Sequence, residues 1–129
     1  MKTKEKQGWQ GRRWIRDEKR LAIYLRDGLA CVYCGATVED GVMLTLDHLQ
    51  PRSKGGRNDA ANLVTCCKKC NSSRQDRPVR RFVRACADYL GDSADAILRQ
   101  VENCRRRKID VEAAKKIMAR RGFRAAIGG

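Results

Sequence analysis

The chain has 129 residues, of which 34% are charged and 5% aromatic, and its formal net charge is +14. This length fits one domain or a small domain with helical extensions, and the low aromatic content excludes a large aromatic core. No apolar run is long enough to cross a bilayer, and the first ten residues lack a signal-peptide hydrophobic stretch. We therefore expect a reducing, cytoplasmic location without a membrane partner, where paired cysteines more often bind metal than form disulfides.

The positive charge is concentrated toward the two ends of the chain. Residues 1–30 carry nine Lys and Arg against four acids, residues 31–65 carry three against four, and residues 66–129 carry seventeen against seven. A near-neutral centre between basic flanks suits a polyanion that is held on both sides of a central site. A soluble basic protein with solvated helix faces, or one that binds membrane surfaces, would show the same charge pattern.

Turn residues and apolar spacing predict the elements of the first part of the chain. Residues 1–13 are polar and basic and predict a flexible arm. Apolar residues at helical spacing predict a helix over 17–27 that stops at Gly28. Residues 44–46 and 63–65 predict two short strands paired as an antiparallel ribbon, on which a helix over 68–75 would lie.

Beyond Pro78 the apolar residues recur at helical spacing in three successive stripes. The first stripe is ended by Gly91, and Ser93 is a capping candidate, with Asp92, for the second. Asp110 opens the third, which runs until Gly122. Residues 78–122 thus predict a helical extension to a first unit over residues 14–77, and residues 123–129 predict a frayed tail.

Two cysteine pairs have the spacing of metal knuckles. Cys31 and Cys34 are separated by two residues, as are Cys67 and Cys70, and 32 residues lie between the pairs. Each pair can place two thiolates on one edge of a tetrahedron, so together they predict a structural zinc site around a folded insert. Unligated buried cysteines are the alternative.

The remaining cysteines are expected to pack in the core. Cys66 competes with its neighbour for the metal, but adjacent residues on an extended segment point to opposite faces. Cys86 and Cys104 lie on the apolar stripes of predicted helices and resemble small hydrophobic residues. We therefore assign four cysteines to the metal and three to the core.

The insert between the cysteine pairs resembles a known family. Residues 47–56 read Asp-His-Leu-Gln-Pro-Arg-Ser-Lys-Gly-Gly, residues 62–64 read Asn-Leu-Val, and residues 67–71 read Cys-Lys-Lys-Cys-Asn. With both cysteine pairs, this pattern is similar to the HNH endonucleases of the ββα-metal fold, in the variant whose third motif position is Asn. The resemblance covers about residues 31–74. It implies an α+β fold: a zinc-stapled ββα nuclease core with an N-terminal helix, followed by the helical extension.

The resemblance also implies roles for four side chains. His48, the only histidine in the chain, would be the general base, and Asn62 would orient it and brace the loop. Asp47 and Asn71 would bind Mg²⁺ or another divalent cation, which prefers oxygen ligands. Because strand alternation would turn Asp47 and His48 apart, we expect the strand to end or twist there.

Basic residues beside this motif are candidates for contact with nucleic-acid phosphates, although solvated loop and helix charges would look the same. The candidates are Arg52, Lys54, Arg57, Arg74, Arg77, Arg80, Arg81 and Arg84.

These features predict a metal-dependent DNA endonuclease that nicks one strand per active site and has no small-molecule substrate. Cutting both strands would then require a homodimer or two encounters, and phage packaging proteins are a further partner class by analogy. The main alternative is a non-catalytic zinc-ribbon module that binds nucleic acid. A third possibility is an RNA-binding zinc protein, which would need the positive charge but not the Asp-His pair.

Overall fold

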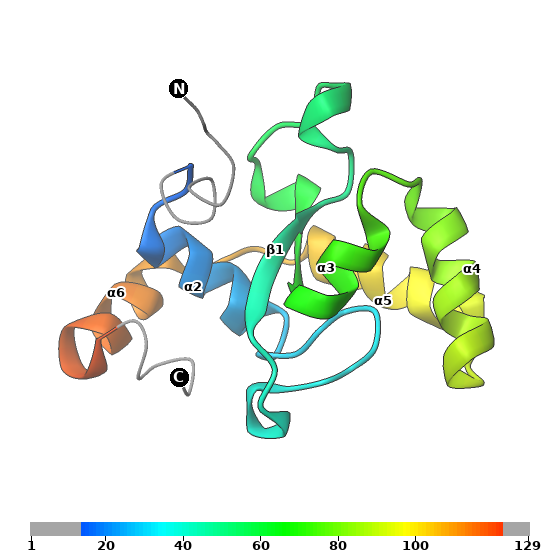
Figure 1. Ribbon diagram of the computed structural model, residues 1–129. Helices are drawn as coiled ribbons and strands as arrows, with labels where there is room; N and C mark the ends of the chain where they lie inside the picture. The colour runs from blue at the N-terminus through cyan, green and yellow to red at the C-terminus, as the bar shows by residue number, and fades with distance from the viewer. Residues whose placement is uncertain (1–13, 123–129) are drawn as a thin grey trace, which may run out of the picture.

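The structure is a computed structural model, and it describes residues 14–122 (Figure 1). The predicted arm at 1–13 and the predicted tail at 123–129 lie outside the described residues. The helices and strands that the structure describes are α2 (Asp17–Arg26), β1 (Leu44–His48), β2 (Leu63–Cys67), α3 (Lys68–Arg74), α4 (Val79–Leu90), α5 (Ala94–Arg106) and α6 (Val111–Arg121). This is the predicted α+β class, and no helix within residues 14–122 has the length and apolarity needed to cross a membrane.

The two strands form the predicted antiparallel ribbon. Their register pairs Leu44 with Cys67 at one end and His48 with Leu63 at the other. The ribbon lies at the centre of the molecule in Figure 1, with α2 and α6 on one side and α3, α4 and α5 on the other. Strand β2 runs directly into α3, which packs back against β1 and completes a ββα unit.

The helix limits follow from local capping. The Ser93 hydroxyl accepts a hydrogen bond from the amide of Ala96 at 3.3 Å and begins α5, and the Asp110 carboxylate accepts one from Ala113 at 3.0 Å and begins α6. Gly91 follows α4 with φ of +70°, a left-handed conformation that side chains other than glycine rarely adopt. The start and stop signals in the sequence therefore located these helices correctly.

The hydrophobic core continues across residue 77. Val64 and Cys66 of β2 pack in one cluster with Phe82 and Val83 of α4 and with Val101 of α5. On the opposite side of the molecule, α6 packs against α2 through the fully buried Ala114. The predicted boundary thus falls in the turn between α3 and α4, and the helices beyond it share their core with the ribbon.

A buried ion pair connects the end of α2 to the ribbon. The Arg26 guanidinium donates to both carboxylate oxygens of Asp27, at 2.7 and 3.1 Å, and to the carbonyl oxygens of Ala60 and Leu63. Asp27 also accepts the backbone amide of Thr65 at 2.8 Å. Both the guanidinium and the carboxylate thus have hydrogen-bond partners inside the protein, and these bonds fix β2 against α2.

Candidate functional site

The four cysteines of the two predicted knuckles form one cluster. The sulfurs of Cys31, Cys34, Cys67 and Cys70 all lie within 4.8 Å of one another, and those of Cys34 and Cys67 are 3.9 Å apart. A tetrahedral zinc with Zn–S bonds of about 2.3 Å would separate its sulfurs by about 3.8 Å. In both knuckles the second cysteine's amide lies 3.4 Å from the first cysteine's sulfur, which suits a thiolate. The donor set fits a tetrahedral soft-metal site.

The crowded sulfurs perturb one another's ionisation. A hydrogen bond from the Cys70 thiol lowers the pKa of Cys31 to about 5, whereas the same bond raises the pKa of Cys70. Burial raises the pKa of Cys34 to about 11. The thiolate form is therefore favoured at Cys31 and the thiol form at Cys34 and Cys70, and a bound cation would favour release of the remaining protons.

The other three cysteines lie outside the cluster, as expected. Cys66 and Cys104 are buried and Cys86 is partly buried against the same core. Cys66 points to the opposite side of β2 from its neighbour and contacts the hydroxyl of Thr45 at 3.4 Å. Burial raises the pKa of Cys66 well above the usual range, in keeping with a neutral core thiol.

His48 ends β1 and lies between an aromatic ring and an amide. Its ring centroid is 4.7 Å from that of Trp14, and its Nε2 is 2.8 Å from Oδ1 of Asn58. Burial lowers the pKa of His48, although the Asn58 hydrogen bond partly opposes this effect. The side chain is thus favoured in the neutral form that a general base requires.

Asn62 braces the loop after His48, whereas the side chain that contacts the imidazole is Asn58. Asn62 accepts the amide of Gln50 at 2.9 Å and donates to the carbonyl oxygens of Gln50 and Arg57. The Cβ of any side chain at Gly56 would lie 1.7 Å from the Gln50 carbonyl oxygen, so this tight closure requires glycine. The predicted bracing role has a direct geometric basis, but within residues 14–122 the hydrogen bond to the His48 ring comes from Asn58 and not from Asn62.

Asp47 lies on the other face of β1, buried among donors. Its Oδ2 accepts a hydrogen bond from the Tyr33 hydroxyl at 2.5 Å and from Arg74 Nη1 at 2.6 Å. The residue is 4% exposed, and burial raises its pKa although Arg74 and Tyr33 act against this. Both donors bind Oδ2, which leaves Oδ1 as the carboxylate oxygen with which Asp47 could bind a metal ion.

Asn71 stands on α3 beside the same strand. Its Nδ2 donates to the Thr45 hydroxyl at 2.9 Å and to the Leu46 carbonyl at 3.2 Å. Because the nitrogen is held by the strand, the amide oxygen is the atom with which Asn71 could bind a metal ion. Asp47 and Asn71 thus each retain an oxygen of the kind that Mg²⁺ prefers, on the two elements that the ββα unit brings together.

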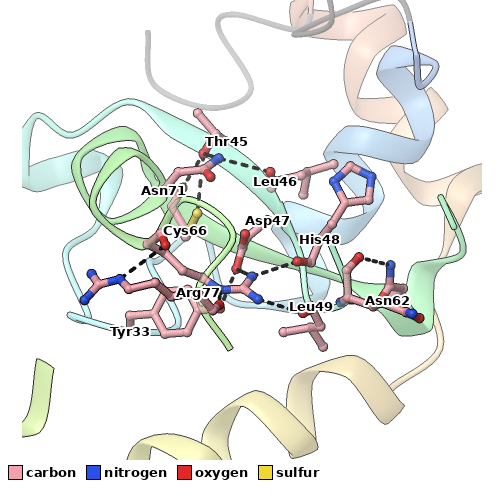
Figure 2. A network of polar contacts seen from close by, with 12 residues as sticks. Tyr33, Thr45, Leu46, Asp47, His48, Leu49, Asn62, Cys66, Asn71 and Arg77 are labelled. Carbon is pink, nitrogen blue, oxygen red and sulfur yellow. Dashed lines mark hydrogen bonds and ion pairs between the residues drawn. The ribbon is translucent and has the colours of Figure 1, made fainter. Parts of the chain in front are cut away.

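The strand ends at His48, as expected, but it ends without a twist that would bring Asp47 and His48 to one side. Both residues remain paired with β2, Asp47 with Val64 and His48 with Leu63. Figure 2 shows the two side chains leaving the strand in different directions. The imidazole and the carboxylate therefore have different hydrogen-bond partners, although each still influences the pKa of the other.

The prediction that Arg74 contacts nucleic acid is wrong in this structure. Arg74 is 0% exposed, and besides Asp47 it donates to the backbone oxygens of His48, Leu49 and Arg77 at 2.7, 2.7 and 3.0 Å. The guanidinium is thus used entirely inside the protein, where it fixes the backbone after the histidine.

Arg77 is half-buried and also has an internal role. It donates to the Ser73 carbonyl at the end of α3 at 2.7 Å, and its guanidinium lies 5.3 Å from the Phe82 ring centroid. The other predicted contacts are exposed around the loop and on α4. They are Arg52, Lys54, Arg57, Arg80, Arg81 and Arg84.

Sequence reasoning missed Tyr33, Asn58 and the internal role of Arg74. One signal existed for Arg74, because it follows Asn71 by three residues and so shares its helix face toward β1. Tyr33 lies inside the first knuckle, but nothing in the spacing indicated that its hydroxyl reaches Asp47. The contact of Trp14 with the histidine ring also had no local signal in the sequence.

Known proteins resemble the segment of the chain that holds this site. Residues 31–77 match the family model described as HNH endonuclease. Two curated relatives are both described as CRISPR-associated endonuclease Cas9. The one from Actinomyces naeslundii is 35% identical over 71 residues, covering 54% of this chain and 6% of that protein. The one from Corynebacterium diphtheriae is 33% identical over 75 residues, covering 57% and 7%.

A solved structure, described as the Type II-C Cas9 enzyme from Actinomyces naeslundii, gives a TM-score of 0.44 at 21% identity over 87% of this chain and 14% of that one. The ribbon, the helix on it and the four-cysteine cluster define a cysteine-stapled ββα domain. Residues 31–77 are thus similar to the HNH endonuclease family, and the chain spans only a small part of the curated relatives it matches.

Proposed function

We propose that this protein is a metal-dependent endonuclease that hydrolyses DNA phosphodiester bonds, nicking one strand per active site with His48 as general base. The observation that carries the proposal is the setting of His48 within the family-matched segment. The imidazole is held by Asn58 and Trp14 at the end of a strand, and burial lowers its pKa. A neutral, oriented imidazole can take a proton from a water that attacks phosphorus.

The oxygens of Asp47 and Asn71 would hold the catalytic divalent cation. Such a cation, when bound, would stabilise negative charge on the phosphate during hydrolysis. Arg74 already offsets the Asp47 charge at 2.6 Å, and Asn71 is neutral, so the protein supplies little net negative charge for a cation. We therefore expect metal binding to be strengthened by the phosphate of the substrate itself.

The four-cysteine cluster would hold zinc as a scaffold. Four thiolates complete a tetrahedral shell and leave no position for a water, so this site has a structural role. Cys70 directly precedes Asn71, and Tyr33 lies between the first two cysteines. The cluster would therefore fix side chains on both sides of Asp47.

Nucleic acid would be bound through the exposed basic residues of the loop and α4. Phosphate contacts of this kind weaken steeply as salt rises, because counterions are released on binding. Arg80, Arg81 and Arg84 occupy exposed positions on one helix. Duplex binding that changes little between low and high salt would argue against this surface.

The test is nicking of a supercoiled plasmid with magnesium by the parent protein and three variants. His48→Ala should lose roughly a hundredfold or more of the rate while keeping metal and DNA binding. Asp47→Ala and Asn71→Ala should also be slower, but part of their activity should return at high magnesium. Rescue of His48→Ala by excess metal, without rescue of the ligand variants, would show that the roles are assigned wrongly.

The main alternative is a non-catalytic module that binds nucleic acid through a cysteine-bound zinc. The saturation of Asp47 Oδ2 by Tyr33 and Arg74 is what a purely structural carboxylate would also show. Salt-sensitive DNA binding without nicking at any magnesium, manganese or pH condition would favour this module.

A further inference from the structure

Asn58 connects the imidazole to two other parts of the protein. Its Oδ1 lies 2.8 Å from His48 Nε2 and also accepts a hydrogen bond from Arg52 Nη1 at 3.0 Å. Its Nδ2 donates to the backbone oxygen of Trp14 at 3.5 Å. The backbone oxygen of Asn58 in turn accepts Lys19 Nζ of α2 at 2.8 Å. The amide is therefore held from several directions.

These contacts fix which end of the amide faces the ring. A guanidinium has only donors, so the atom that Arg52 contacts must be the amide oxygen. A backbone carbonyl only accepts, so the atom that faces Trp14 must be the amide nitrogen. The two contacts independently require the same orientation of the Asn58 amide, and in this orientation its oxygen faces His48 as an acceptor.

A neutral imidazole has one donor nitrogen and one acceptor nitrogen. Because Asn58 offers an acceptor, Nε2 must carry the proton, and Nδ1 keeps the lone pair. We propose that Asn58 is a positioning residue that holds neutral His48 in the Nε2–H tautomer, so that Nδ1 is the atom that accepts the proton from the attacking water. This inference rests on the proposed function of His48 as general base.

The proton balance of the step is simple. One O–H bond of the water breaks and its proton joins Nδ1, while the water oxygen forms the new bond to phosphorus. The bond from phosphorus to the leaving 3′-oxygen breaks, and that oxygen takes a proton from solvent. The imidazolium keeps its Nε2–H bond to Asn58 throughout and later returns the Nδ1 proton to solvent.

The chain has one histidine, so ring-nitrogen NMR reports on His48 without overlap from other histidines. Protein labelled with ¹⁵N-histidine is measured at a pH of about 9, where an ordinary imidazole is neutral. Couplings to the two ring carbon-bound protons distinguish Nε2 from Nδ1. We expect a protonated Nε2 and an unprotonated Nδ1; a protonated Nδ1 in the parent protein would overturn the proposal.

Three variants separate this role from a general effect on the loop. Asn58→Ala removes the acceptor, so the two ring-nitrogen shifts should converge as the tautomers interchange, and nicking should fall roughly tenfold or more. Asn58→Asp retains an acceptor oxygen and should keep the Nε2–H pattern. Asp59→Asn changes the neighbouring exposed residue, which pairs with Arg57, and should match the parent in both measurements.

These measurements distinguish a failure of the positioning role of Asn58 from a failure of the proposed nuclease function. An Asn58→Ala protein that keeps the parent's ring-nitrogen pattern and rate would refute the positioning role. A parent protein with the Nε2–H tautomer but no nicking under any metal condition would instead refute the nuclease and leave the tautomer assignment standing.

Discussion

The hydroxyl of Tyr33 donates a hydrogen bond to Asp47 Oδ2 at 2.5 Å, from a position between two cysteines of the cluster. Tyr33 is 2% exposed, and its ring packs edge-on against Phe82 with centroids 5.0 Å apart. Burial raises the pKa of Tyr33 well above its usual range, so the phenol keeps the proton that it donates. The first knuckle thus determines how a carboxylate on the ribbon is turned.

Replacing Tyr33 by Phe should weaken binding of the catalytic metal. The variant keeps the ring packing on Phe82 but leaves Arg74 as the remaining donor, so the carboxylate can rotate toward the guanidinium. Loss of such a supporting hydrogen bond typically costs about 10- to 100-fold in metal affinity or activity. We expect the magnesium concentration for half-maximal nicking to rise roughly tenfold, with zinc content unchanged. An unaltered magnesium dependence would show that the hydroxyl does not orient Asp47.

Arg74→Met should destabilise the protein severely, because it leaves the Asp47 carboxylate buried without its charge partner. Breaking a buried pair in this way costs about 3–5 kcal/mol. Urea unfolding followed by circular dichroism measures the loss. The matched control is Arg81→Met on the exposed face of α4, which should change stability by about 0.5 kcal/mol or less. Similar unfolding of the two variants would contradict the structural role of Arg74.

The nicking rate should rise with pH to a plateau, and the midpoint should lie below the ordinary histidine value of about 6.5. Burial disfavours the imidazolium and lowers the pKa of His48, so the neutral base persists to lower pH. Arg52 and Arg74 lower this pKa further, whereas the hydrogen bond to Asn58 and the charge of Asp47 oppose the shift. Protonation of Asp47 could produce a similar acid limb, since burial raises its pKa. Magnesium competes with that proton, so the profile is measured at two saturating magnesium concentrations. If the midpoint of the rate profile still differs between the two magnesium concentrations, the acid limb is due to protonation of Asp47.

Purified protein should contain one zinc per chain, and removing the metal should unfold the ribbon. Zinc binding by four thiolates contributes about 10–16 kcal/mol, which is comparable to the whole stability of a typical domain. Cys34→Ser should therefore lose zinc and secondary structure by circular dichroism. Cys86→Ser is the control, because Cys86 is a partly buried cysteine outside the cluster, and it should retain both. Native secondary structure in zinc-free protein would refute the scaffold role.

The parts of the fold that could be predicted are those set by local chemistry. The caps at Ser93 and Asp110 and the glycine after α4 depend on atoms within a few residues, so the sequence pattern was enough. The two cysteine pairs could also be predicted, because the spacing within each pair is local. Only the approach of one pair to the other depends on the fold. The ribbon followed from two short alternating runs joined by a loop.

The contacts around the candidate site depend on pairs far apart in the chain. Arg74 reaches Asp47 across 27 residues, and Asn58 reaches the Trp14 carbonyl across 44. No periodic pattern in the sequence predicts either contact. An arginine near the motif is the same in sequence whether its side chain faces a phosphate or a buried carboxylate. That is why Arg74 was mistaken for a surface residue and why Asn58 was overlooked.

The neighbouring cysteines at 66 and 67 have a consequence for misfolding. If β2 slipped by one residue along β1, every side chain of the strand would change faces, and Cys66 would take the place of Cys67 beside the other sulfurs. A zinc ion alone would discriminate poorly between these two thiols. The slipped ribbon would lose the bond from the Thr65 amide to Asp27 and would turn the fully buried Leu63 away from its core. Packing of α2 against β2 therefore distinguishes the two registers, and it places Cys67 instead of Cys66 in the four-cysteine cluster.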